Sequence, residues 1–156
     1  MIKIKERDLT LETPWGMFNH RVGCLAFHED MILLERSPSA YWFTPGGRVS
    51  FGEFSQDAVL REIKEELSIH LDDAEWAGLL ENYFTMYGKR FHEVSILYRI
   101  TVPIETLLPT VDDNGDPVFY GWHAINTLQD LDLRPHFLSD RIAEFKQGVT
   151  HVLHKE

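Results

Sequence analysis

The sequence lacks a second cysteine, since Cys24 is the single one among 156 residues. No disulfide can form within the chain, which fits a reducing compartment. Cys24 lies in the apolar run Val22–Phe27, so we expect its thiol to be buried and inert. A chain of this length buries about two-thirds of its unfolded surface and needs no covalent staples. We therefore expect one domain over residues 1–156.

Long hydrophobic runs are also missing. No segment approaches the ~18 consecutive apolar residues that suggest a membrane span. The first residues, Met1–Glu6, alternate apolar and charged side chains and contain no apolar core of signal-peptide length. We therefore expect a cytoplasmic protein with no membrane partner.

Basic residues are scarce relative to acidic ones. Lys and Arg number 15 against 25 Asp and Glu, which gives a formal net charge of −10. Proteins that bind nucleic acid polymers without sequence preference neutralise phosphates with Lys and Arg, so this class of partner is not expected. A small anionic substrate can still bind if metal cations bridge it to carboxylates, and the position of the carboxylates then matters more than their number.

Hydrophobic periodicity and turn residues predict a mixed sheet covered by helices, an α/β fold. Helical spacing predicts a helix over Ser55–Leu67 with Ser55 as its N-cap, and a second helix over residues 137–148. The predicted strands are an edge strand at 2–12, a hairpin of 20–27 with 31–36, a short aromatic strand at 41–44, a pair at 76–87 and 91–102, and a strand at 118–123.

Three carboxylates share one face of the first helix. Glu62, Glu65 and Glu66 stand at i, i+3 and i+4, about 120° from the apolar face. Clustered carboxylates repel each other, but Mg²⁺ prefers oxygen ligands and reverses that repulsion. The simpler alternative is a solvated charged face on a surface helix.

The segment from Gly47 to Ile69 resembles the Nudix box, Gly-x5-Glu-x7-Arg-Glu-U-x-Glu-Glu-x-Gly-U, in which U is an aliphatic residue. Eight of the nine specified positions match, and Ser68 stands where the box has glycine. The resemblance extends over roughly residues 20–147 and, with the length of the chain, predicts a single Nudix hydrolase domain over residues 1–156. Its fold would be an α/β/α sandwich with a mixed β-sheet and a loop-helix-loop catalytic box.

The resemblance also implies an activity. Nudix-type hydrolases cleave the diphosphate bond of a nucleoside diphosphate derivative or nucleotide-like small molecule, with Mg²⁺ as cofactor and Mn²⁺ as a substitute. Arg61 would orient Glu62, and catalysis would involve Arg61 with the three helix carboxylates. The implied metal ligands are Gly46 through its carbonyl, Glu53, Glu62, Glu65 and Glu66.

A further carboxylate from outside the box is expected as metal ligand or base. The candidates are Glu93, Glu105, Asp112 and Asp113. We favour Glu93 because it opens a predicted strand, and strand ends hold side chains better than a polar loop does.

Other functions remain open at this stage. These are a non-catalytic Nudix-fold module that senses a nucleotide, a Nudix-related isomerase that would need a cysteine/glutamate pair, and a general interaction domain. A homodimer is also left open. Trp42, Tyr83, Phe84 and Tyr87 could stack on a base, although core packing is the simpler explanation for each. No sequence marker identifies the substrate.

Overall fold

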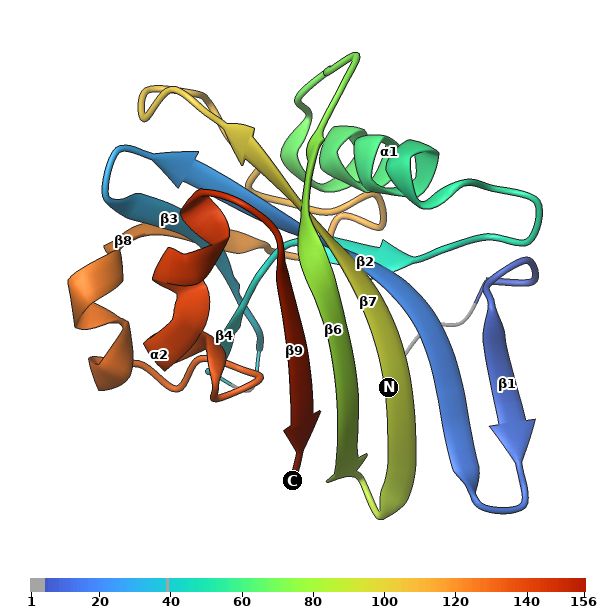
Figure 1. The fold of residues 1–156 in the computed structure, drawn as a ribbon. Coiled ribbons are helices and arrows are strands. Elements are labelled where there is room, and N and C mark those ends of the chain that lie inside the picture. The colour runs from blue at the N-terminus through green and yellow to red at the C-terminus, as the bar shows by residue number, and fades with distance from the viewer. Residues whose placement is uncertain (1–4, 39) are drawn as a thin grey trace.

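A computed structural model describes residues 5–38 and 40–156 of the chain (Figure 1). Its described residues form one sheet of nine strands. The strands are β1 (Thr10–Thr13), β2 (Gly16–His28), β3 (Met31–Arg36), β4 (Trp42–Phe43), β5 (Gly46–Arg48), β6 (Glu75–Met86), β7 (Lys89–Thr101), β8 (Phe119–Ala124) and β9 (Thr150–Lys155). The helical segments are α1 (Ser55–Leu67), α2 (Leu138–Arg141) and the 3-10 helices η1 (Ile125–Asp130) and η2 (Ile142–Lys146).

The sheet is mixed, and helical segments lie on both of its faces. Its main path runs β4-β3-β2-β7-β6-β9, with β1 and β5 paired to β2 and β8 paired to β3. The pairs β2–β7 and β6–β9 are parallel, whereas the others are antiparallel. Helix α1 lies on one face, and α2 lies on the other (Figure 1). The predicted α/β/α sandwich with a mixed sheet is therefore confirmed.

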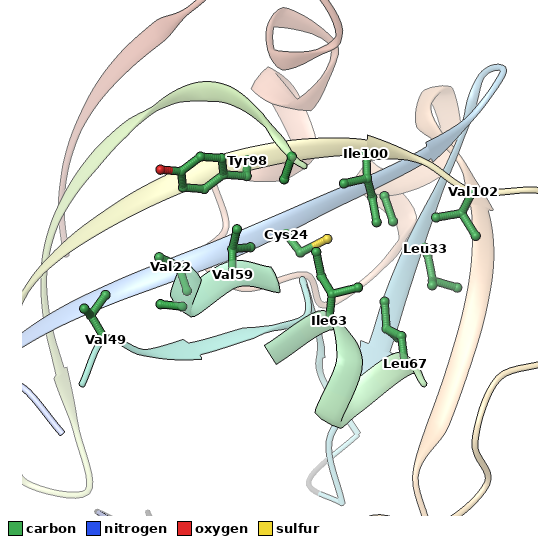
Figure 2. Packing of buried hydrophobic residues seen from close by; sticks show 13 residues of the cluster. Val22, Cys24, Leu33, Val49, Val59, Ile63, Leu67, Tyr98, Ile100 and Val102 are labelled. Atoms are coloured by element: carbon green, nitrogen blue, oxygen red, sulfur yellow. The ribbon is translucent and has the colours of Figure 1, made fainter. Parts of the chain in front are cut away.

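The apolar stripe of α1 forms one half of the core. Figure 2 shows Val59, Ile63 and Leu67, spaced four residues apart, in one buried cluster with Val22 and Cys24 of β2 and Leu33 of β3. This spacing places all three on one helix face. Cys24 is fully buried, as expected, and burial raises the pKa of its thiol far above the ordinary value.

A second apolar cluster fills the opposite face of the sheet. Leu25 of β2 and Leu80 of β6 pack there with Phe145 of η2 and Val152 of β9. The two clusters hold both helical layers against the sheet, which fixes α1 relative to the strands beneath it.

Three sequence expectations about elements need correction. The edge strand covers only Thr10–Thr13, because residues 5–8 turn back instead; residues 1–4 lie outside the described part. Ser55 does not cap α1: the cap position is Phe54, and the Ser55 hydroxyl lies 2.8 Å from the hydroxyl of Tyr98.

The C-terminal helix expected over residues 137–148 is interrupted. α2 gives way to η2 at Ile142, and the chain then forms β9, which pairs in parallel with β6. Burial of Val152 against the sheet outweighs local helix propensity here. Among the helices of the described residues, none has the length and apolar content that a bilayer span requires.

Candidate active site

Helix α1 presents its three carboxylates to different environments. Glu62 is buried, with only 9% of its surface exposed, while Glu66 is half-buried and Glu65 is exposed. Glu62 therefore does not belong to a solvated face of the helix. The reason is that β5 packs directly against this flank of the helix.

Arg61 binds the carboxylates around it. Its Nε and Nη2 donate to the two carboxylate oxygens of Glu53 at 2.7 and 3.0 Å. Its Nη1 donates to Oε1 of Glu62 at 2.7 Å and more weakly to Oε2 of Glu65 at 3.4 Å. Bidentate charge-assisted bonds fix a carboxylate in position. Arg61 therefore reaches Glu62, as the sequence pattern suggested, and Glu53 anchors Arg61.

Two glycines of β5 complete the support of the helix carboxylates. The backbone N–H of Gly46 donates to Oε2 of Glu66 at 2.9 Å. The Glu62 carboxylate lies directly over Gly47, where an added Cβ would approach Glu62 Oε1 to 2.3 Å. Pairing of β5 with Val22 and Gly23 of β2 holds this backbone in place. Glycine at position 47 is thus required by close approach rather than by an unusual backbone angle.

Carboxyl groups of the helix and the sheet lie close enough to shift one another's pKa. Burial raises the pKa of Glu66 well above its ordinary value, and the nearby Glu35 and Glu62 raise it further. Burial, with Asp112 as a second cause, raises the pKa of Glu35 to about 7. Such a cluster favours protonation unless a cation neutralises it.

The helix carboxylates line a cavity of about 350 Å³. A loop opposite α1 contributes Asp112, Asp113 and Asn114, and the sheet contributes Arg21 and Arg48. Asp112 is held by its own loop, because its Oδ1 accepts from the backbone N–H groups of Asn114 and Asp116 at 2.8 and 2.9 Å. The cavity therefore combines an acidic side with a pair of arginines.

The two arginines were missed by reasoning from sequence. Arg48 directly follows Gly47, but Arg21 lies far from the box in sequence and is brought beside Arg48 only by the pairing of β2 with β5. Burial lowers the pKa of Arg48, and the neighbouring Arg21 lowers it further. The signal that could have identified Arg21 is a charged residue at the entry to an otherwise apolar strand.

Not every expected residue lies in this cavity. Glu53 faces Arg61 and accepts a bond from the backbone N–H of Ser50 at 2.9 Å, so both its oxygens already have partners. Glu93 lines a neighbouring cavity, where its Oε1 accepts from Asn19 Nδ2 at 2.9 Å. The structure thus brings Asp112 and Asp113, rather than Glu93, beside the helix carboxylates.

The donor atoms around the acidic cavity suit a hard divalent cation. They are carboxylate oxygens. Because Gly47 has no side chain, the Glu62 carboxylate can lie against its backbone. In residues 5–38 and 40–156, no three His, Cys, Asp or Glu side chains already converge tightly enough to enclose an ion. Glu62 and Glu65 bind Arg61 instead, so metal binding would require a side-chain rearrangement, for which exposed Glu65 has room.

Comparison with known proteins agrees with this arrangement. The NUDIX domain model matches residues 17–144. The chain is 28% identical over 115 residues to "Uncharacterized Nudix hydrolase YvcI" of Bacillus subtilis (strain 168), covering 72% of this chain and 70% of the relative. A MutT NUDIX hydrolase structure from Burkholderia pseudomallei shares 28% identity at a TM-score of 0.60, covering 81% of this chain and 95% of that one.

A MutT protein from Methanosarcina mazei Go1 shares the fold, with a TM-score of 0.64 at 23% identity, covering 87% of this chain and 96% of that one. The family model includes α1 with its box and both sides of the acidic cavity. The chain belongs to the NUDIX domain family.

Proposed function

We propose that the chain is a Mg²⁺-dependent hydrolase that cleaves the diphosphate bond of a nucleoside diphosphate derivative. The observation that supports this most strongly is the acidic cavity, in which Glu62, Glu65 and Glu66 face a loop bearing Asp112 across a gap edged by Arg21 and Arg48. A diphosphate carries dense negative charge. It fits a site that joins cation-binding carboxylates to fixed guanidinium groups.

We assign cation binding and proton transfer to different residues of the site. Glu62 and Glu66 are oriented by Arg61 and by the N–H of Gly46, and after the side chains converge they would hold the cation together with the Gly46 carbonyl. A bound divalent cation supplies neutralisation of phosphate oxygens and a lowered pKa for water. Glu65 is exposed, and its contacts with Lys5 and Arg61 are long, at 3.3 and 3.4 Å, which suits a group that accepts the proton of the attacking water.

The positive side of the cavity orients the substrate. Arg21 and Arg48 would bind the diphosphate oxygens and keep the scissile bond over the carboxylates. Asp112 lines the same cavity, and its Oδ1 accepts two backbone N–H bonds within its own loop, so it is our candidate for the carboxylate supplied from outside the box.

A substrate panel tests this function. The purified chain is incubated with nucleoside diphosphate sugars, dinucleoside polyphosphates and nucleoside triphosphates, with and without MgCl₂, and products are identified by mass spectrometry. Mg²⁺-dependent appearance of two phosphorylated products is expected for at least one compound. Tight binding with no product in any mixture would indicate a nucleotide-sensing module instead.

A further inference from the structure

A second cavity adjoins the acidic one and shares two residues with it. Its volume is about 290 Å³, and Arg21 and Arg48 line both cavities. It lies over β2, β7 and β6 on the face that carries Leu25 and Leu80. A molecule whose diphosphate lies beside the two arginines can therefore extend into this second cavity.

Four aromatic side chains line the second cavity, and the guanidinium of Arg134 lies 4.8 Å from the centre of one of them, the ring of Tyr41. Phe84 and Phe91 stack with ring centroids 5.2 Å apart and planes 9° from parallel. Phe43 of β4 and Tyr41, which directly precedes β4, also line the cavity, with their ring centroids 5.9 Å apart. Flat faces of this kind suit a planar heterocycle, which gains stacking and apolar burial from them.

The floor of the cavity is polar, although the same sheet face is apolar further along. Asn19, Glu93 and Asn82 are direct neighbours across β2, β7 and β6, and of these three Glu93 and Asn82 line the cavity. Asn19 and Asn82 are buried at 1% and 6% exposure, and the Glu93 side chain is 13% exposed. Polar side chains are rarely buried, and a buried polar group is costly unless it has a hydrogen-bond partner. A buried polar cluster beside a cavity therefore indicates a binding role.

In the row formed by Asn19, Glu93 and Asn82, the Asn19 end is hydrogen-bonded, whereas the Asn82 end has an acceptor oxygen without a partner among the described residues. Asn19 accepts from the Thr10 hydroxyl and donates to Glu93 Oε1, both at 2.9 Å. Within the described residues, Asn82 Oδ1 is buried and has no hydrogen-bond partner. Glu93 Oε1 already accepts from Asn19 and lies 3.9 Å from Arg21 Nη1, so Glu93 would receive an N–H of an occupant on its second oxygen. Asn82 Oδ1 is enclosed, and it would reach an occupant by a turn of the side-chain amide.

We propose that the second cavity binds the base of the substrate, and that Glu93 and Asn82 select a base edge with adjacent N–H donors, as guanine has. The N1–H and exocyclic amine of guanine would donate to the two acceptors. The corresponding edge of adenine sets an acceptor nitrogen against them and loses a bond. This inference rests on the proposed function, since it takes the arginines to bind the phosphates.

Binding without turnover tests this selection. The dissociation constants of GMP, AMP and ribose 5-phosphate are measured by calorimetry for the intact chain in EDTA, so that no hydrolysis is required. Wild-type protein should bind GMP at least tenfold more tightly than AMP. Glu93→Gln and Asn82→Leu should each weaken GMP binding at least tenfold and change ribose 5-phosphate binding less than twofold.

A matched control distinguishes recognition from folding. Glu81 is another half-buried carboxylate on β6, but it lies on the opposite face and binds His151 at 2.8 Å. Glu81→Gln should leave GMP affinity unchanged. Equal affinity of wild-type protein for GMP and AMP would overturn the proposal, even if the variants failed to fold. So would an equal loss of all three ligands in Glu93→Gln. Selective GMP binding combined with no hydrolysis of any compound would contradict the proposed function alone.

Discussion

At the scale of single residues, the site depends on how closely side chains approach the backbone. Glu62 lies over the Cα of Gly47, so its carboxylate occupies the space of a missing side chain. Arg61 then holds it from the other side at 2.7 Å. The position of this carboxylate is set by two neighbours, which makes it sensitive to changes that leave the fold intact.

Gly47→Ala should weaken Mg²⁺ binding without unfolding the protein. The new methyl group would meet the flexible end of Glu62, which can move aside, so the melting temperature should fall by less than about 2 °C. Displacing the carboxylate should raise the Mg²⁺ dissociation constant at least about tenfold, the scale of lost support for a metal ligand. Isothermal titration with MgCl₂ measures this.

The double variant supplies the control. In a Glu62→Gln background, Gly47→Ala should add little further loss, because both changes act through one carboxylate. Additive losses would mean that Gly47 acts on metal binding by another route.

The box residues could be identified from sequence, whereas their surroundings could not. The spacing of Glu62, Glu65 and Glu66 is a local property of one helix, so it can be read directly. Arg21 reaches the site only through strand pairing. Burial of Glu62 likewise depends on β5, a three-residue strand with too little sequence to carry a pattern.

At the scale of elements, α1 ends in the geometry that the box glycine would adopt. Ser68 has φ 56° and ψ 26°, which is left-handed, and its N–H donates to the carbonyl of Lys64. A non-glycine residue there pays about 1 kcal/mol.

Ser68→Gly should therefore stabilise the protein by about 0.5–1 kcal/mol in urea denaturation. Lys64→Gly is the control, since position 64 is exposed and right-handed helical, and should destabilise by about 1 kcal/mol. Lower stability of Ser68→Gly would show that the helix end is not left-handed in solution.

The C-terminal elements could not be predicted from local sequence pattern alone. The bounds of α1 were predicted correctly because its apolar stripe is long and regular. β9 was not predicted, since its six residues gain their stability by pairing with β6 and by burial of Val152, and neither is visible in a short stretch of sequence.

Phe145 tests whether this C-terminal segment belongs to the core. It is fully buried on η2, so Phe145→Ala should cost about 3–5 kcal/mol of unfolding free energy. Phe51 is 78% exposed, and Phe51→Ala should change stability by less than about 0.5 kcal/mol. Similar denaturation midpoints for the two variants would contradict the packing of η2 against the sheet.

At the scale of the whole molecule, a net charge of −10 is gathered partly into one cavity. Mg²⁺ that binds the folded state alone must stabilise it. At a concentration roughly tenfold above its dissociation constant, the melting temperature should rise by about 3–6 °C. A variant with Gln at positions 62, 65 and 66 should show almost no rise. NaCl at matched ionic strength controls for screening, and an equal rise in both proteins would place the metal elsewhere.

The most direct test of the acidic cavity as a catalytic centre is the turnover number of Glu65→Gln on the best substrate at saturating Mg²⁺. Glu65 is exposed, so the fold should survive, and an unchanged melting temperature checks this. Loss of the proton acceptor should lower kcat by at least ~10²-fold, while Lys64→Gln on the same helix should retain wild-type kcat. Wild-type turnover in both Glu65→Gln and Glu66→Gln would contradict the assignment of hydrolysis to this cavity.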